Sequence, residues 1–285
     1  MVPPFALQPP EPVDTVDLFP AERHSLIQLL SGLTDEQWHR PTICPGWTVH
    51  DVALHLLGVD LGNLSRGRDG FQNPGTEGPV DDRWPQIVAF VNQINEQWVI
   101  AARRISPRLL CDLLAFTGEP IAAYFRDLDL AAMGEPVAWA GPAAVPVWLD
   151  VAREYTERWV HQQQIRDALA LPGFKEPDYM RPVLATFVHA LPPALHDMHA
   201  APGTCLRLVI GGPAGGSWIA MRSADAWLLG QDHRGPVTVT VIIDQEAAWR
   251  LFSKGMSRDE ASAHLAIEGD RALGLKVLEM VSIIA

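Results

Sequence analysis

The spacing of apolar residues changes once along this chain, after Leu171-Pro172-Gly173, and this change limits the possible folds more than any other feature. Before it, apolar residues recur at intervals of three and four, which is typical of helices with one buried face. After one further helical stretch, short runs rich in β-branched residues follow between Gly, Pro and Asp, which is typical of strands and turns. The pattern predicts helices at about 16–33, 49–64, 85–105, 107–114, 121–127, 146–169 and 178–198, a loop at 66–82, strands at 206–210, 217–221, 226–229 and 237–243, and helices at 244–253 and 270–281.

Two domains are therefore expected in a chain of 285 residues. Residues 1–14 are rich in proline and are predicted to be a flexible lead-in. Residues 15–172 are predicted to form an all-α domain, and residues 173–285 a smaller α+β domain. Val and Thr alternate from Val237 to Val241, as in a strand with one buried face, and the sheet is expected to be mainly antiparallel.

Composition and charge exclude several classes of function. Hydrophobic residues make up 48% and charged residues 20% of the chain, as in an ordinary globular protein. The formal net charge of −12 repels phosphate backbones and anionic lipids, so neither nucleic acid nor a membrane is expected as a partner. No apolar run approaches the roughly 20 residues of a spanning helix, and the N-terminus lacks the pattern of a secretory signal.

The three cysteines, Cys44, Cys111 and Cys205, lie far apart in the sequence. An odd and sparse set of this kind argues against a disulfide framework and favours the reducing cytoplasm as the location. None of the three has the CxxC spacing of a redox or zinc motif. No feature of the sequence indicates an oligomeric state.

Glu157 and His161 are the candidate metal ligands with the best spacing. They lie four residues apart in the helix expected at 146–169, so both side chains lie on one face, one turn apart. His55 belongs to the earlier helix at 49–64, and it completes a site of two histidines and one carboxylate if the two helices are neighbours in a bundle. From spacing alone, an ion pair on a solvated helical face is the commoner explanation of the Glu157–His161 pair.

Other charged residues of these two helices have two interpretations each. Asp51 lies one turn before His55 and could orient its ring, but it also lies three residues after Thr48, where it would complete a capping box; the capping role is favoured. Arg158 and Arg166 could contact a carboxylate-bearing ligand, but exposed ion pairs are favoured. No catalytic or cofactor-binding residue is predicted from spacing.

Three stretches resemble the mycothiol-dependent maleylpyruvate isomerase family. The first runs from Leu33 to Trp38 and then from Cys44-Pro45-Gly46-Trp47-Thr48-Val49 to His55-Leu56-Leu57-Gly58, and it resembles the opening of that family. The second, 153–168, resembles the family's late metal-binding helix, and the third, 267–273, is similar to its second domain. The resemblance covers nearly the whole chain after the lead-in. It implies a DinB-like four-helix bundle followed by a domain related to sterol-carrier-like folds.

The resemblance also implies a metal site and a chemistry. The metal-binding histidines of the family fall on His55 and His161, and its metal-binding carboxylate falls on Glu157. In that family a divalent metal, usually zinc, is thought to bind the sulfur of a thiol cofactor, mycothiol, and to favour its thiolate. The chain is therefore expected to be an isomerase or transferase that uses mycothiol or another low-molecular-weight thiol on a small electrophilic substrate.

Two other functions stay open at this point. One is a metal-containing protein that binds a small molecule without turnover, with an apolar ligand in the second domain. The other keeps the same ligands but holds iron and activates oxygen, as some sites of two histidines and one carboxylate do. The helical-bundle setting and the family resemblance both count against the iron site.

Overall fold

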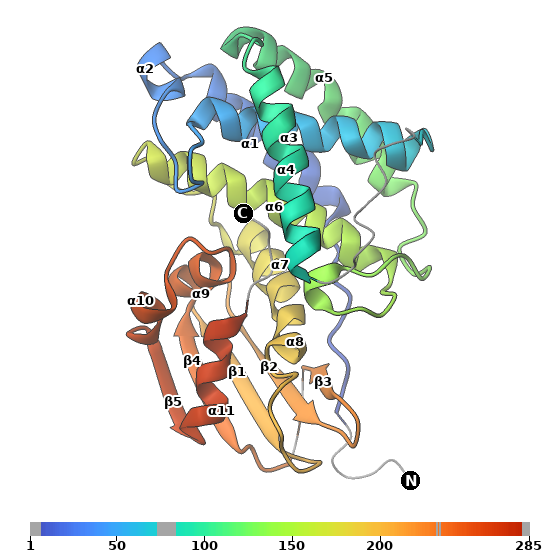
Figure 1. Cartoon of the computed structure of the whole chain (residues 1–285), viewed down its shortest axis with the longest axis vertical. Coiled ribbons are helices and arrows are strands. Elements are labelled where there is room, and N and C mark those ends of the chain that lie inside the picture. Colours follow the sequence, from blue (N-terminus) through green and yellow to red (C-terminus); the bar gives the residue numbers. More distant parts are fainter. Residues whose placement is uncertain (1–6, 73–83, 232, 234, 281–285) are drawn as a thin grey trace.

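In the computed structural model, a helical half lies above a half that contains one β-sheet (Figure 1). The structure describes residues 7–72, 84–231, 233 and 235–280. None of the helices in these residues is long and apolar enough to span a lipid bilayer. The order of elements confirms the predicted fold class, a helical N-terminal region followed by an α+β region.

The helical half contains six α-helices among the described residues. They are α1 (Phe19–Ser31), α2 (Asp35–Trp38), α3 (Val49–Gly62), α4 (Trp84–Ala102), α5 (Pro107–Arg126) and α6 (Val147–Ala168). The predicted break between 114 and 121 is wrong, because α5 continues through Pro120 and buries Leu110, Leu114, Thr117 and Ile121. The loop predicted at 66–82 begins later than expected, because one π-helical turn (Asn63–Arg68) extends α3; residues 73–83 lie outside the described residues.

The start of α3 is set by local sequence. Thr48 Oγ1 accepts a hydrogen bond from the backbone N–H of Asp51 at 3.3 Å, and Asp51 Oδ2 accepts one from the backbone N–H of Thr48 at 3.0 Å. This reciprocal pair is a capping box, and it confirms the favoured role of Asp51. In the turn before it, Gly46 has a φ of +78°, a left-handed conformation that suits glycine. The turn and the cap together fix the entry point of the helix that carries His55.

The second half is built around a five-stranded sheet of order β3-β2-β1-β4-β5. The strands are β1 (Cys205–Gly211), β2 (Gly216–Arg222), β3 (Trp227–Gly230), β4 (Val239–Asp244) and β5 (Leu265–Gly269). Only β1 and β4 run parallel, so the sheet is mainly antiparallel, as predicted. The edge strand β5 was not predicted, because it is only five residues long and none of its side chains is fully buried.

Short helices cover the sheet and join it to the helical half. They are α7 (Pro177–Phe187), α8 (Leu191–Ala194), α9 (Gln245–Phe252), α10 (Arg258–Ser262) and α11 (Arg271–Leu275). The continuous helix predicted at 178–198 is wrong: a 3₁₀ turn follows α7, and Pro192-Pro193 lie in the separate α8. The helix predicted at 270–281 is also shorter, since α11 passes into a 3₁₀ turn at Lys276–Glu279.

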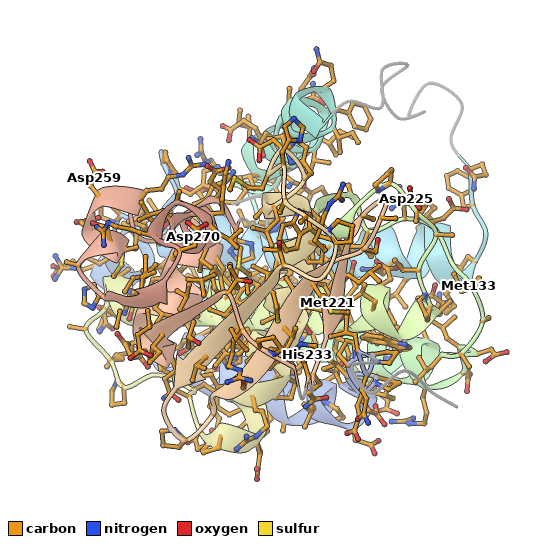
Figure 2. The ribbon with its side chains drawn as sticks, turned by 90° about the horizontal axis from the view of Figure 1, so that it is seen from below. Met133, Met221, Asp225, His233, Asp259 and Asp270 are labelled. Atoms are coloured by element: carbon orange, nitrogen blue, oxygen red, sulfur yellow. The ribbon has the colours of Figure 1, made fainter. Side chains whose placement is uncertain are left out.

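Figure 2 views the molecule from the sheet end. Asp259 and Asp270, at the starts of α10 and α11, lie on the opposite side of this view from Met133, which belongs to the loop before α6. Met221 of β2 and His233 lie between them, where the sheet crosses the view. The sheet half therefore extends across the end of the helical half.

The two halves share one hydrophobic core. Trp159 of α6 packs edge-on against Trp249 of α9, with ring centroids 5.5 Å apart, and both rings are buried. Part of the predicted flexible lead-in is also held in place, because Gln231 donates its backbone N–H to the carbonyl of Gln8 at 2.9 Å and Val13 is buried. Residues 1–6 of that lead-in lie outside the described residues.

Candidate metal site

The structure brings His55, Glu157 and His161 together, although 102 residues of sequence separate the first two. His55 comes from α3, and the other two come from one face of α6. One ligand atom from each residue lies within 4.8 Å of the others. His55 Nε2 lies 3.2 Å from Glu157 Oε1, and the two imidazole rings meet edge-on with centroids 4.7 Å apart. These three residues could hold a metal ion.

The two ring nitrogens of His161 differ in their hydrogen bonding. Nδ1 lies 2.7 Å from Gln164 Oε1, whereas the buried Nε2 has no hydrogen-bond partner among the described residues. Burial, together with the nearby His55, lowers the pKa of His161 to about 4, so the ring is neutral at neutral pH. A buried nitrogen without a partner is unfavourable, and a metal ion would supply the missing partner. The donor set therefore fits a divalent cation.

The carboxylate of Glu157 is held from two sides. Its Oε1 faces His55, and its Oε2 accepts a hydrogen bond from Arg153 Nη1 at 3.3 Å. Burial alone would raise the pKa of Glu157. The hydrogen bond to His55 and the positive charge of Arg153 outweigh burial, and the pKa lies well below its usual range. Glu157 therefore remains an ionised carboxylate, the form that binds metals.

Two chambers border the triad. The larger, of about 470 Å³, is lined by both histidines of the triad, by the turn residues Cys44, Pro45 and Trp47, and by Asn92, Gln93, Asn95 and Glu96 of α4. The smaller, of about 250 Å³, is lined by Glu157, Arg153 and Asp150 of α6, by Trp139, and by Ile87, Val91, Asn95, Pro136, Val137 and Ala138. The histidines thus line one chamber and the carboxylate lines the other, and Asn95 lines both.

Three charged residues considered from the sequence lie elsewhere. The carboxylate of Asp51 binds Thr48 and accepts a hydrogen bond from Arg103 Nε at 2.8 Å, so it is engaged in capping and pairing rather than in orienting His55. Arg158 is 1% exposed and pairs with Asp60 and Glu154, so neither a ligand contact nor an exposed ion pair describes it. Arg166 binds the side chains of Gln162 and Ser25.

Two contacts of the triad, those made by Gln164 and Arg153, were not predicted from the sequence. Gln164 lies three residues after His161, a helical spacing that could have indicated the contact. Arg153 precedes Glu157 by four residues, which is also a helical spacing that could have indicated their pairing. The lining residues of α4 carry no comparable signal, because their place depends on how α4 packs across α3. Cys44 also lines the larger chamber, and burial raises the pKa of its thiol to about 11.

One protein family matches this chain, and two solved structures are similar to it. The family described as Mycothiol maleylpyruvate isomerase N-terminal domain matches residues 19–166, just over half of the chain and all three residues of the triad. Two crystal structures of mycothiol-dependent maleylpyruvate isomerase, one of them a histidine-to-alanine mutant, are similar over 89% of this chain and 91% of theirs. Their sequence identities are 15% and 16%, and both TM-scores are 0.49.

Relatives are also found among curated sequences. Two uncharacterized proteins of Mycobacterium tuberculosis, from strains CDC 1551 / Oshkosh and ATCC 25618 / H37Rv, are each 27% identical over 162 residues. The aligned region is 53% of this chain and 54% of the relative, so the chain spans about half the length of the curated relatives it matches.

Proposed function

The chain belongs to the mycothiol maleylpyruvate isomerase family, and from this premise we propose that it is a metal-dependent enzyme that uses a low-molecular-weight thiol to isomerise or transfer a small electrophile. His55, Glu157 and His161 would hold the divalent cation, for which zinc is the first candidate. One observation carries the proposal. A ligand atom from each of the three residues lies within 4.8 Å of the others, and one of these residues, His161, has a buried Nε2 without a hydrogen-bond partner among the described residues.

The donor set supports this chemistry. Two imidazole nitrogens and one carboxylate oxygen suit zinc, and they leave coordination positions open for a thiol or water. A bound divalent cation would lower the pKa of a thiol sulfur and so favour the nucleophilic thiolate. The protein itself supplies one ligand carboxylate that stays ionised and one ligand imidazole that stays neutral at neutral pH.

The two chambers support a reaction of two partners. The larger chamber has amide side chains from α4 and the Trp47 ring, whose centroid lies 5.3 Å from that of His55, and it suits a polar thiol. The smaller chamber has mostly apolar walls and one polar side, where the guanidinium of Arg153 is paired with Asp150 and Glu157, and it suits a small electrophile with a polar end. With the triad between them, the two reactants would meet at the metal.

Metal binding is tested first. Protein purified without an affinity tag and dialysed against zinc is expected to hold close to one zinc ion per chain by elemental analysis. His161→Ala is expected to lose it, because two remaining ligands rarely hold a divalent ion tightly. His24→Ala, a change of an exposed histidine outside the site, is the matched control and should keep the metal. A wild-type protein without metal would overturn the proposal.

Turnover is tested next with the zinc-loaded protein. Mycothiol and a panel of α,β-unsaturated carbonyl compounds and alkyl halides are supplied, and the loss of electrophile and of free thiol is followed. Isomerisation leaves the thiol concentration unchanged, whereas transfer consumes one thiol per product. Stoichiometric zinc without turnover, together with tight binding of an apolar molecule, would favour a non-catalytic metal-containing binding protein. Iron with oxygen uptake would contradict the thiol chemistry.

A further inference from the structure

We propose that Gln164 is a positioning residue for the metal site, and that its side-chain oxygen selects the tautomer of His161 that leaves Nε2 free to bind a metal. The role in metal binding rests on the proposed function. The choice of tautomer does not, because it is a property of the metal-free protein.

The first step is the contact between the two side chains. His161 Nδ1 lies 2.7 Å from Gln164 Oε1, and both residues are only 2% exposed. An amide oxygen accepts hydrogen bonds and cannot donate one, so the proton of the neutral ring must be on Nδ1. The lone pair is then on Nε2, which belongs to the triad and has no hydrogen-bond partner in the part of the chain that the structure describes.

The second step is the orientation of the amide itself. Cys44 donates its Sγ–H to the same oxygen of Gln164, with the two atoms 3.2 Å apart. If the amide were turned over, its NH₂ group would face the Nδ1–H of His161 and could not accept from it, and the Cys44 thiol would lose its oxygen acceptor. Cys44 therefore holds Gln164 in the orientation that accepts from His161.

The third step is the connection between the two helices. Cys44 lies in the turn before α3, which carries His55, while Gln164 and His161 lie on α6. The Cys44–Gln164 contact thus joins the turn that sets one ligand to the residue that orients another. In known metal sites, an oxygen acceptor on the second ring nitrogen fixes the ring and increases its basicity.

The tautomer is tested without any metal. In protein labelled with ¹⁵N at histidine, long-range ¹H–¹⁵N correlation spectra at pH 7.5 should show the His161 proton on Nδ1. Gln164→Leu should move the proton to Nε2 or give a mixture of tautomers, and Gln164→Glu should restore Nδ1–H. An unchanged Nδ1–H signal in Gln164→Leu would overturn the proposal. Gln164→Met, with an unbranched side chain of similar length, replaces the leucine variant if that variant does not fold.

Zinc affinity is the second readout, measured by competition with a chromophoric chelator. Gln164→Leu should weaken zinc binding by about 10- to 100-fold, and Gln164→Glu should bind within a few-fold of wild type. Gln163→Leu is the matched control, since Gln163 is equally buried but binds Trp159 and Phe174 instead of the triad. Equal losses in the two leucine variants would overturn the positioning role. A wild-type protein that fails to bind zinc would overturn the proposed function and leave the tautomer result to stand by itself.

Discussion

Two imidazoles, that of the buried His161 and that of the half-buried His189, show how burial sets the protonation state of single residues in this protein. The pKa of each is lowered to about 4, chiefly because the charged ring would lose its hydration. His161 faces the triad, whereas His189 lies edge-on against Trp148, with ring centroids 5.5 Å apart. The same physical effect thus keeps one ring in the neutral form that could bind a metal, and it makes protonation of the other ring unfavourable to the folded state at acid pH.

This cost predicts a pH-dependent stability. A histidine has a pKa of about 6.5 in the unfolded chain and His189 one of about 4 in the folded protein, so the unfolded state binds more protons between these values. Stability is therefore lost as the pH falls from 6.5 towards 4. His189→Phe keeps an aromatic ring and removes the titration. Its free energy of unfolding, relative to that of wild type, should therefore be about 2 kcal/mol higher at pH 5 than at pH 8.

The measurement is urea unfolding at the two pH values for wild type, His189→Phe and the surface control His24→Gln. Other groups also contribute to the pH dependence, so the comparison uses the difference in the free energy of unfolding between each variant and wild type. His24→Gln should follow the wild-type dependence on pH. An identical dependence for His189→Phe would contradict the assigned cause.

At the scale of elements, one buried carboxylate joins four helices. Asp60 of α3 binds Arg23 of α1 at 2.7 Å, Arg158 of α6 at 3.0 Å, and Thr117 of α5. Burial alone would raise the pKa of Asp60, but the two arginines outweigh it and lower the pKa. Because this cluster joins α3 to α6, it also helps to fix the relative position of the two helices, which places His55 opposite Glu157.

Removing the shared carboxylate should therefore be costly. Asp60→Ala leaves two buried guanidinium groups without this partner, and a loss of about 3–5 kcal/mol in the free energy of unfolding is expected. Asp69→Ala, which breaks an exposed pair with Arg68, is the matched control and should cost far less than Asp60→Ala. Urea unfolding monitored by circular dichroism measures both. Similar small losses in the two variants would show that the buried cluster does not hold the helices together.

For the whole molecule, the shared core predicts a single unfolding transition. The buried cluster runs from Phe19 through Trp159 to Trp249 and the sheet, and an ion pair between Asp167 and Arg250 lies beside it. Opening either half would expose this apolar surface, so the halves should unfold together. Tryptophan fluorescence and far-ultraviolet circular dichroism should give coincident denaturation curves. Two separate transitions would show that each half is stable without the other.

Sequence predictions succeeded where the interactions are local in sequence and failed where they depend on contacts between distant elements. The start of α3 was predictable because Thr48 and Asp51 form its cap locally, and β4 because its alternation is local. The edge strand β5 and the continuity of α5 were not, because each depends on the element it packs against. The candidate ligands were identified through the family resemblance, since helical spacing alone relates only Glu157 to His161.

The sequence by itself determined where most helices and strands lie and which faces are apolar, because periodicity and capping act over a few residues. It also determined that Glu157 and His161 share a face. Only the tertiary structure decided that His55 meets them, that two chambers border them, and that Gln164 binds His161 while Cys44 binds Gln164. The physical reason is that an apolar face requires burial but does not specify its partner. That choice is made when α1, α3, α5 and α6 pack together around the buried charges of Asp60, Arg23 and Arg158, and when α4 packs against α3.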